Sequence, residues 1–484
     1  MTEQALHKNF IAGEWLEGPG VIDNQNPSDL SQHLGQFSQA NAEQTHTAIA
    51  AARQAQPQWA AIGLEARYTT LLNIGTELIA RAEELGRILS SEEGKPLAEG
   101  KGEIYRAGQF FHYYAAEVHR QIGDITDSVR PGIEVLAQRE PVGVVGVISP
   151  WNFPLATAVW KIAPALAFGN SVVWKPANLV PASAWHFAEI MSRQAMPAGT
   201  FNLVMGPGRA VGDALSGAAD VDAISFTGSV EVGREVGLRA MGQLTRVQME
   251  MGSKNPLVIL DDADIDTAVQ CAFVGGYSGS GQKCTASSRL IVTDAMHDRF
   301  VDALCARLAN APVGHALDPN TQIGPIVDAG QFQQNLDWIE TAKQAGATLA
   351  FGGEPVKANT QGYFLAPTLF TDTHNAMRIN QEEMFGPIAC VIRVKDAHEA
   401  LSVANDTRFG LTAGVITESL SAANTFRRQA RFGCTMVNLP TAGTDYHVPF
   451  GGRGESSYGP REQGQYAREF YTRVKTSYIR TGEG

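Results

Sequence analysis

The chain has 484 residues, 44% of them hydrophobic, and a formal net charge of −12, because 50 acidic residues outnumber 38 basic ones. This length allows roughly two to four domains with ample buried core. The acidity argues against nucleic acid and against an anionic membrane as partners, although a few local cations are enough to bind a small anionic substrate.

No segment of the sequence predicts export, membrane insertion or a structural metal site. Residues 1–15 lack the basic stretch and the following apolar stretch of a signal peptide, and no run of about 18 apolar residues occurs. The five cysteines are scattered, and neither CxxC nor HExxH is present. We therefore expect a cytoplasmic protein without a membrane segment, a disulfide framework or a bound metal.

Residues 41–94 predict helices, because apolar side chains recur at helical spacing. The segment from Arg67 predicts one long amphipathic helix that ends near Gly94. A further helix is predicted over residues 101–121, where aromatic side chains form a stripe. Such a stripe favours a place in the core over a place in a site.

From residue 140 the pattern changes to short β-branched runs separated by helical segments. The predicted strands are 141–150, 170–178, 199–206 and 221–229. The predicted helices are 155–168, 182–195, 208–217 and 230–240. This alternation indicates a parallel, doubly wound sheet, and such sheets bind ligands at the carboxyl ends of their strands. The residues at those ends are Trp151–Asn152, Lys175–Pro176, Gly206–Gly208 and Thr227–Ser229.

A second α/β unit is predicted from residue 256 onward, because the pattern of strand, turn and helix occurs there twice. The segments 119–139 and 468–480 are rich in β-forming residues and fit neither unit. Strands of this kind either extend a sheet or pair with another subunit.

Two motifs carry residue types suited to covalent chemistry. Glu250 lies in "VQMEMGSKNP", and Cys284 lies in "GSGQKCTASS", directly after a glycine-rich turn. A thiol with a carboxylate base suggests covalent catalysis on a carbonyl. Lys283 beside the thiol is expected to favour the thiolate. A single cysteine is more often a small buried hydrophobe, so the surrounding motifs must support the assignment.

The motifs at the predicted strand ends add polar groups, each with two interpretations. In "FTGSVEVG", Gly228 lets the backbone approach a phosphate, or marks a plain strand–helix turn. Lys175 holds ribose hydroxyls or is solvated. Asn152 is a donor suited to an oxyanion, whereas most such Asn residues only stabilise turns. In "QEEMFGP", Glu383 and Phe385 are site residues, or an exposed acid and a core aromatic.

The order and spacing of the motifs match one family over nearly the whole chain, residues 9–478. The matching motifs are "ISPWNFPL", "VVWKPAN", "FTGSVEVG", "MEMGSKNP", "GQKCTASSR", "EEMFGP", "ANDTRFGL" and "VPFGGRGESSYGPREQG". The chain resembles the aldehyde dehydrogenase superfamily of NAD(P)-dependent enzymes. Ser253 departs from the glycine that this family usually has, but it replaces no catalytic group. "SSYGPREQG" differs from the commoner "SGxGRE" and indicates a subgroup.

The resemblance implies an α/β fold with a Rossmann-type cofactor domain, an α/β catalytic domain and a β-rich oligomerisation arm. It assigns 1–118 and 140–249 to the cofactor-binding domain and 250–438 to the catalytic domain. Residues 439–467 are a return segment to the cofactor domain and the substrate tunnel. The arm consists of 119–139 and 468–484. Family members assemble by strand exchange, so we expect a homodimer or a homotetramer.

The resemblance also implies the catalytic roles. Cys284 attacks the aldehyde carbon to give a thiohemiacetal, and the Asn152 amide with the Cys284 backbone N–H stabilises the oxyanion. Hydride transfer to the nicotinamide leaves a thioester, and Glu250 activates the water that hydrolyses it. Glu462 matches a second acid that some members use in a proton relay.

For the cofactor, the family pattern gives Lys175 the adenine ribose, Glu383 the nicotinamide ribose and Phe385 a place beside the nicotinamide. NAD-preferring members often carry a Glu three residues after the Lys, and here that position is Asn178. Since Asn does not repel a 2′-phosphate, we expect NADP to be accepted, with NAD also usable. The expected cofactor residues are Pro150, Trp151, Lys175, Asn178, Gly208, Gly212, Phe226, Thr227, Gly228, Ser229, Glu383 and Phe385.

The tunnel positions of the family carry small polar residues and cations here. The expected substrate residues are Phe153, Thr157, Trp160, Lys161, Ser278, Lys283, Thr285, Thr444 and Phe450, with Arg453 and His447 as further cations. They favour a small anionic aldehyde. We expect 2-oxoglutarate semialdehyde (2,5-dioxopentanoate) first, succinate semialdehyde second, and a sulfonated aldehyde such as sulfolactaldehyde as a further alternative.

Two readings from other classes remain open. A CoA-acylating dehydrogenase commonly lacks the Glu base, which is present here as Glu250. A non-catalytic protein on the same fold is expected to have lost Cys284, Asn152 or Glu250, and all three are in place.

Overall fold

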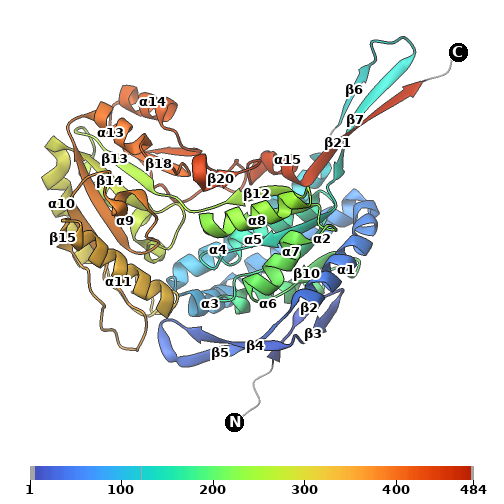
Figure 1. Cartoon of the computed structure of the whole chain (residues 1–484), viewed down its shortest axis with the longest axis horizontal. Helices are drawn as coiled ribbons and strands as arrows, with labels where there is room; N and C mark the ends of the chain where they lie inside the picture. Colours follow the sequence, from blue (N-terminus) through green and yellow to red (C-terminus); the bar gives the residue numbers. More distant parts are fainter. Residues whose placement is uncertain (1–5, 121–122, 481–484) are drawn as a thin grey trace.

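The computed structural model describes residues 6–120 and 123–480. Two large sheets, each flanked by helices, form the two halves of the molecule, and a narrow β arm projects from one of them (Figure 1). Residues 1–5, 121–122 and 481–484, which belong to the predicted cofactor domain and arm, lie outside the described residues.

The first large sheet has eight strands in the order β20-β12-β11-β8-β9-β10-β2-β3. Its strands are β2 (Asn9–Ile11), β3 (Glu14–Leu16), β8 (Val144–Ile148), β9 (Ser171–Lys175), β10 (Phe201–Leu203), β11 (Ala223–Thr227), β12 (Arg246–Glu250) and β20 (Ser457–Tyr458). The five strands from β12 to β10 are parallel. Four of them correspond to the predicted strands, and β12 was not predicted. Their register brings Thr227 beside Glu250 and Ile148 beside Lys175 at the carboxyl edge.

The helices around this sheet also agree with the predicted segments, to within a few residues at their ends. They are α1 (Ala42–Ala61), α5 (Ala156–Ala167), α6 (Pro181–Ser192), α7 (Asp213–Gly217) and α8 (Val230–Gly242). The predicted helix 208–217 opens with a π-helical turn, η2 (Gly208–Gly212). Buried apolar residues of α5 and α6 cover one face of the sheet.

The long helix predicted up to Gly94 is wrong as a single element. The structure has α2 (Leu64–Ala80) and α3 (Ala82–Glu93), which meet at Arg81 with φ −97° and ψ 14°. Arg81 leaves the helical conformation, and its guanidinium donates to Glu77, Glu84 and Glu189. Glu77 and Glu84 lie within four residues of Arg81, whereas Glu189 is on α6, so Arg81 connects the junction of α2 and α3 to α6.

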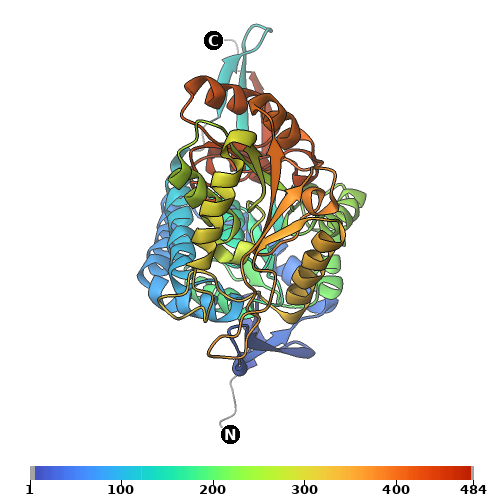
Figure 2. The same cartoon turned by 90° about the vertical axis from the view of Figure 1, so that its left-hand side faces the viewer.

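The next helix, α4 (Leu97–Glu117), contains the predicted aromatic stripe and continues into the short η1 (Val118–Arg120). Figure 2 shows α2–α4 as blue helices stacked along one side of the molecule. Phe110, Phe111 and Tyr114 of the stripe are buried in the core, as predicted.

The second large sheet has seven strands in the order β15-β16-β17-β14-β13-β18-β19, all parallel except β15. Its strands are β13 (Asn255–Ile259), β14 (Ser287–Thr293), β15 (Thr348–Phe351), β16 (Thr368–Thr373), β17 (Ile388–Val394), β18 (Thr412–Ile416) and β19 (Cys434–Val437). Its helices are α9 (Ile265–Gly276), α10 (Asp294–Ala309), α11 (Ala329–Gln344), α12 (Arg378–Gln381), α13 (Ala397–Asn405) and α14 (Leu420–Gln429). The predicted second α/β unit is thus confirmed.

The two β-rich end segments pair with each other. β6 (Asp124–Asp127), β7 (Ile133–Pro141) and β21 (Thr472–Arg480) form an antiparallel sheet in the order β21-β7-β6. This sheet, called the arm below, is separate from both large sheets and stands clear of the body (Figure 1).

A small sheet of β1 (Leu6–His7), β5 (Asp29–Gln39) and β4 (Gly20–Asn26) completes the fold. Among residues 6–120 and 123–480, none of the helices combines the length and apolar character needed to cross a bilayer. In the same residues, His, Cys, Asp and Glu side chains form no group suited to hold a metal ion.

Candidate active site

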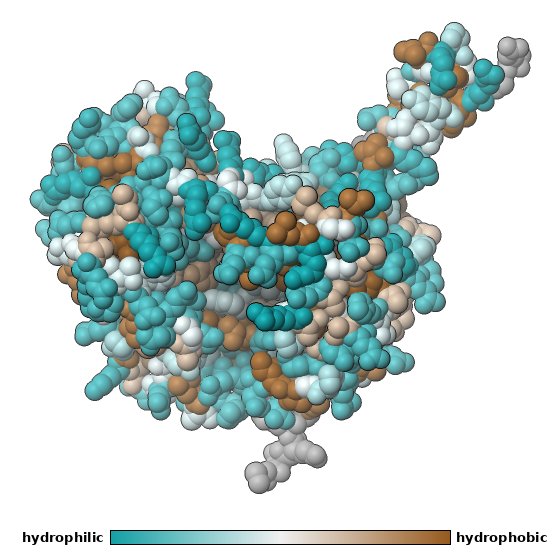
Figure 3. Space-filling view, viewed as in Figure 1, coloured by the Kyte–Doolittle hydropathy of each residue, from teal (hydrophilic) through white to brown (hydrophobic). Residues whose placement is uncertain are grey.

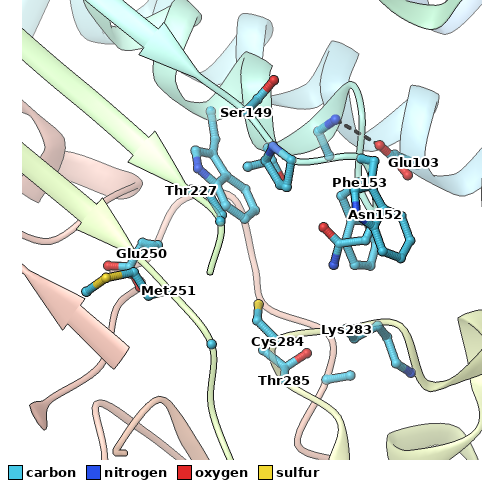
Figure 4. Close-up of a pocket in the computed structure, with 18 of the residues that line it drawn as sticks. Glu103, Ser149, Asn152, Phe153, Thr227, Glu250, Met251, Lys283, Cys284 and Thr285 are labelled. Carbon is cyan, nitrogen blue, oxygen red and sulfur yellow. Dashed lines mark hydrogen bonds between the residues drawn. The ribbon is translucent and has the colours of Figure 1, made fainter. Parts of the chain in front are cut away.

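A cavity of about 1050 Å³ lies where the carboxyl edge of the eight-stranded sheet faces the second half of the molecule. The ends of β8, β9, β11 and β12 line one side, and the loop around Cys284 lines the other. Figure 4 shows the Cys284 sulfur directed into this space, with Glu250 and Met251 on one side and Asn152 on the other. Residues from distant parts of the chain therefore meet as the motifs predict.

A glycine-rich turn presents Cys284. The turn η3 (Ser278–Gly281) contains three residues with positive φ, Gly279 (56°), Ser280 (54°) and Gly281 (65°). A Cβ at Gly281 would lie 2.1 Å from the carbonyl oxygen of Gly386, so only glycine fits there. The Asn255 side-chain amide donates to the carbonyl of Cys284 at 2.7 Å and fixes the nucleophile loop.

The surroundings of Cys284 raise its pKa above the ordinary range, through burial first and then through the carboxyl groups of Glu383 and Glu250. The expectation that Lys283 favours the thiolate is wrong. The Lys283 ammonium turns away from the sulfur and donates to the carbonyl of Val274 at 2.8 Å and to Ser278 Oγ at 2.7 Å (Figure 4). A raised pKa favours the thiol over the thiolate.

Asn152 follows β8, and its side-chain amide is directed at the nucleophile loop. Asn152 Nδ2 donates to the carbonyl of Gln282 at 2.9 Å, which leaves the second hydrogen of the amide for another acceptor. Lys95 Nζ donates to the backbone carbonyl of Asn152 at 2.7 Å and pairs with Glu103 at 2.6 Å. Glu103 in turn accepts from the N–H of Ala156 at 3.0 Å. This buried network fixes the position of the loop that carries Asn152.

Glu250 ends β12 and is 3% exposed. Ser457 Oγ donates to Glu250 Oε2 at 2.6 Å. Burial, followed by the carboxyl group of Glu462, raises the pKa of Glu250 well above its ordinary value, while Ser457 and Lys161 lower it. A carboxyl group shifted upward in this way can act as a base near neutral pH.

Glu462 and Lys161 lie behind the wall of the cavity and do not line it. The Lys161 ammonium, on α5, pairs with Glu462 and also donates to Ser225 Oγ at 3.1 Å. Both side chains are almost fully buried. The expectation that Lys161 holds the substrate is therefore wrong, because its charge is already neutralised by Glu462.

Arg453 and His447 are exposed residues and do not line the cavity, so these two expectations are wrong as well. His447 directly precedes the motif that begins at Val448, and Arg453 lies within that motif, but both side chains are on the surface. The other predicted substrate residues do line the cavity: Phe153, Thr157, Trp160, Ser278, Lys283, Thr285, Thr444 and Phe450.

Sequence reasoning missed the contribution of α4. The helix lines the cavity through Glu99, Gly102, Glu103, Arg106 and Phe110. Gly102, Arg106 and Phe110 are four residues apart and therefore lie on one face of the helix. This spacing is the sequence feature from which their shared position could have been predicted. The same reasoning missed Gln463, which lines the cavity directly after Glu462.

Most of the predicted cofactor residues also line the cavity. They are Pro150, Trp151, Lys175, Phe226, Thr227, Gly228, Ser229, Glu383 and Phe385. Asn178, Gly208 and Gly212 do not line it. Gly212 nevertheless lies near Lys175, since a Cβ there would be 3.8 Å from Lys175 Cδ.

The residues of this region suit a nucleotide. Ser229 caps α8 by accepting from the N–H of Val232 at 3.3 Å, and such a helix N-terminus attracts phosphate. Burial lowers the pKa of Lys175 to about 8. Thr227 Oγ1 and Asn178 Oδ1 are buried without a hydrogen-bond partner in the described chain. A cation, a helix terminus and free hydroxyl and amide oxygens fit a dinucleotide with two riboses.

Glu383 lies on the other side of this region, and burial raises its pKa to about 7. It accepts from the backbone N–H of Ser253 at 2.9 Å, while Ser253 Oγ donates to Asn255 Oδ1 at 2.7 Å. A Cβ at Gly252 would lie 2.1 Å from Glu383 Oε2. The serine at position 253 thus leaves the carboxylate contact intact, because the backbone makes it.

Comparison with known proteins gives a consistent result. The model of the "Aldehyde dehydrogenase family" matches residues 15–477. The chain is 38% identical over 484 residues to alpha-ketoglutaric semialdehyde dehydrogenase of Bacillus subtilis (strain 168), covering 99% of each chain. It is 36% identical over 474 residues to 2,5-dioxopentanoate dehydrogenase of Saccharolobus solfataricus, covering 97% of this chain and 98% of the relative.

The structure is also similar to solved ones. Betaine aldehyde dehydrogenase of Staphylococcus aureus in complex with NAD+ matches with a TM-score of 0.96 and 34% identity, over 99% of this chain and 96% of that one. These identities are too close to one another to separate an anionic from a cationic substrate, so the cavity itself has to be considered.

Proposed function

The chain belongs to the aldehyde dehydrogenase family, and on that premise we propose that it oxidises a small anionic semialdehyde, 2,5-dioxopentanoate first, with NADP or NAD. The observation that carries the proposal is the substrate side of the cavity, which presents the cation Arg106 together with the polar side chains of Ser278, Thr285 and Thr444. A cation there attracts a carboxylate and repels a quaternary ammonium aldehyde. Within the anionic class, the names of two relatives, alpha-ketoglutaric semialdehyde dehydrogenase and 2,5-dioxopentanoate dehydrogenase, are the reason for placing 2,5-dioxopentanoate first.

In the proposed reaction, the Cys284 thiol gives up its proton to water in the cavity, and its sulfur attacks the aldehyde carbon, forming the oxyanion of a thiohemiacetal. The free hydrogen of the Asn152 amide and the Cys284 backbone N–H donate to the oxyanion. A nicotinamide held by Glu383, Trp151 and Phe385 would supply the hydride acceptor that the oxidation of the thiohemiacetal to a Cys284 thioester requires. Glu250 then takes a proton from the water that attacks the Cys284 thioester, which releases the carboxylate product and the thiol.

Glu250 has a second carboxyl group in electrostatic contact, Glu462. Glu462 is paired with Lys161 behind the cavity wall. We propose that the proton taken by Glu250 is passed toward this buried pair, in line with the relay role expected for Glu462. A CoA-acylating reaction is disfavoured because Glu250 is present as a base for water.

For the cofactor, Lys175 and the oxygens of Thr227 and Asn178 are proposed to hold the adenine ribose and the phosphates, and Glu383 the hydroxyls of the nicotinamide ribose. Trp151 and Phe385 pack edge to face, with ring centroids 5.3 Å apart, and close the region around the nicotinamide. Asn178 carries no charge that would repel a 2′-phosphate, which supports use of NADP.

The domain assignment from the resemblance remains part of this proposal, with 1–118 and 140–249 as cofactor domain and 250–438 as catalytic domain. The arm is proposed to join subunits in a homodimer or homotetramer. It carries exposed apolar side chains that the body does not cover, namely Ile125, Val129, Val474, Tyr478 and Ile479 (Figure 3).

The experiment that tests the function is steady-state kcat/KM for 2,5-dioxopentanoate, succinate semialdehyde, sulfolactaldehyde, betaine aldehyde and hexanal, each with NAD and NADP. We expect the anionic aldehydes to lead by about a hundredfold, which is about 2.7 kcal/mol of transition-state discrimination. A lead for betaine aldehyde or hexanal would refute the substrate class and leave the family chemistry in place.

A further inference from the structure

Two polar side chains in the cavity wall lack a polar partner. Arg106, on α4, makes no hydrogen bond or ion pair within residues 6–120 and 123–480, and its guanidinium lies over the ring of Tyr446 at 5.5 Å. Gln463 is 1% exposed, and neither its Oε1 nor its Nε2 has a hydrogen-bond partner in the same residues. Buried polar groups are nearly always paired, so the Gln463 amide is suited to a ligand. The half-buried Arg106 guanidinium lines the same cavity, and its charge is unpaired among the described residues.

The other charges near the substrate side are compensated. Glu103 pairs with Lys95 at 2.6 Å. Lys283 donates to Val274 and Ser278 and interacts electrostatically with Glu99. Arg106 is therefore the cation on this side whose charge is available to a substrate anion.

The backbone at Gln463 supports a functional role for its amide. Its φ of 63° with ψ of 169° is a conformation that residues other than glycine rarely adopt. Glu462 N and O pair with Phe450 on one side, and Tyr114 Oη donates to the Gly464 carbonyl at 3.2 Å on the other. These contacts hold the strained residue with its side chain at the cavity.

Arg106 and Gln463 reach the same part of the cavity. Phe110, Trp160 and Phe450 form an aromatic collar there. The ring centroid of Trp160 lies 6.1 Å from that of Phe110 and 5.5 Å from that of Phe450. Arg106 lies one helical turn before Phe110 on α4. Gln463 follows the residue that pairs with Phe450. Two segments that are distant in sequence thus place the Arg106 guanidinium and the Gln463 amide beside the same aromatic side chains.

We propose that Arg106 binds the carboxylate of the semialdehyde and that the Gln463 amide donates to its 2-oxo group, so that these two residues set the substrate preference. The guanidinium matches a carboxylate with two parallel N–H···O bonds. A carbonyl oxygen only accepts, and the Gln463 Nε2 supplies a donor. This inference rests on the proposed function and specifies which atoms of the substrate are recognised.

Three aldehydes of equal chain length separate the two contacts: 2,5-dioxopentanoate, 5-oxopentanoate and pentanal. The first two differ only in the 2-oxo group, and the last two only in the carboxylate. The measurement is kcat/KM for each aldehyde in the wild type and in each variant, expressed as two ratios. Ratios within one variant cancel any loss of correctly folded enzyme.

In the variant Arg106→Met, we expect the ratio of 5-oxopentanoate to pentanal to fall about 30- to 100-fold, and in Arg106→Lys to fall less, because the charge stays and the fork is lost. In Gln463→Met, we expect the ratio of 2,5-dioxopentanoate to 5-oxopentanoate to fall about 5- to 10-fold, with the other ratio kept. Lys101→Met is the matched control, a cation on the same helix that does not line the cavity and pairs with Glu83.

The outcomes separate the two levels of the proposal. A wild type that does not prefer 5-oxopentanoate to pentanal refutes the anionic substrate and with it the role of Arg106. A wild type with that preference, unchanged in Arg106→Met but lost in Lys283→Met, refutes the role of Arg106 alone. A ratio of 2,5-dioxopentanoate to 5-oxopentanoate that Gln463→Met leaves unchanged refutes the role of Gln463.

Discussion

The side-chain amide of Asn152 donates to the backbone carbonyl of Gln282 across 2.9 Å, and Gln282 lies just before the nucleophile loop residue Cys284. This bond ties the end of β8 in one sheet to the loop before β14 in the other. The proposed oxyanion donor and the nucleophile are therefore held by one contact, so their relative position does not depend on flexible side chains alone.

Replacement of Asn152 by Ala removes the donor for the oxyanion. We expect kcat/KM to fall about 10²- to 10³-fold, as for other oxyanion-hole donors. Cofactor affinity, measured by quenching of tryptophan fluorescence, should stay near the wild-type value. Near wild-type turnover in this variant would mean that the Cys284 backbone N–H suffices.

Replacement of Cys284 by Ala should abolish dehydrogenation and leave cofactor binding intact, because only the nucleophile is lost. The measurement is the rise of reduced cofactor at 340 nm, together with a binding titration. Cys305→Ala is the matched control, since Cys305 is a free, partly buried cysteine on α10 that does not line the cavity. Turnover in Cys284→Ala would contradict the covalent scheme.

The variant Glu250→Gln separates acylation from hydrolysis of the thioester. We expect a rapid burst of reduced cofactor, close to one per active subunit, followed by slow steady turnover, because the base for water is absent. Stopped-flow absorbance measures both phases. If the burst itself disappears, Glu250 also takes the proton of the Cys284 thiol.

The raised pKa of Cys284 predicts the pH dependence of its alkylation. Burial and the nearby carboxyl groups disfavour the thiolate, so its fraction stays small at neutral pH and keeps rising above the ordinary thiol range. We expect the rate of iodoacetamide labelling to increase through about pH 10, whereas N-acetylcysteine levels off as it passes about 8.5. Mass spectrometry of the labelled peptide measures the rate for Cys284. A rate that reaches a plateau near neutral pH would contradict the raised pKa.

The buried pair of Lys161 and Glu462 predicts a large loss of stability when one partner is removed. Lys161→Met leaves the Glu462 charge buried and unpaired, which is expected to cost about 3–5 kcal/mol of unfolding free energy. Lys343→Met, which breaks an exposed pair with Glu340 at 3.0 Å, is the control and should change it by about 0–1 kcal/mol. Urea unfolding measures the free energy of unfolding of both variants. Equal losses in Lys161→Met and Lys343→Met would mean that the buried pair does not stabilise the fold.

The exposed apolar side chains of the arm predict self-association. Light scattering of the wild type should give the mass of a dimer or a tetramer. Val474→Lys on β21, where Val474 is 61% exposed, should shift the mass toward one chain. Leu420→Lys on α14, where Leu420 is 77% exposed, should not. A single-chain mass for the wild type would contradict the oligomer.

The sequence by itself determined which residues meet at the cavity from the strand-end motifs. Asn152, Lys175 and Thr227 follow or end predicted parallel strands, and the carboxyl ends of neighbouring parallel strands lie at one edge of a sheet. Glu250 was assigned from its motif, because the strand that it ends was not predicted. Local pattern and strand order are enough to bring such residues together. The strands and helices between residues 140 and 240 could also be predicted, because the hydrophobic periodicity and the turn residues that define them are local features of the sequence.

Only the tertiary structure decided what each charged side chain does. Lys161 and Glu462 are far apart in sequence, yet their buried pairing removes Lys161 from the substrate side. Arg81 connects the junction of α2 and α3 to Glu189 on α6, and Lys283 turns away from the thiol toward Val274. The sequence analysis did not identify Arg106 as a site residue, because the aromatic stripe of its helix favours a place in the core. The role of a charge depends on which opposite charge lies beside it after folding, and sequence spacing does not contain that information.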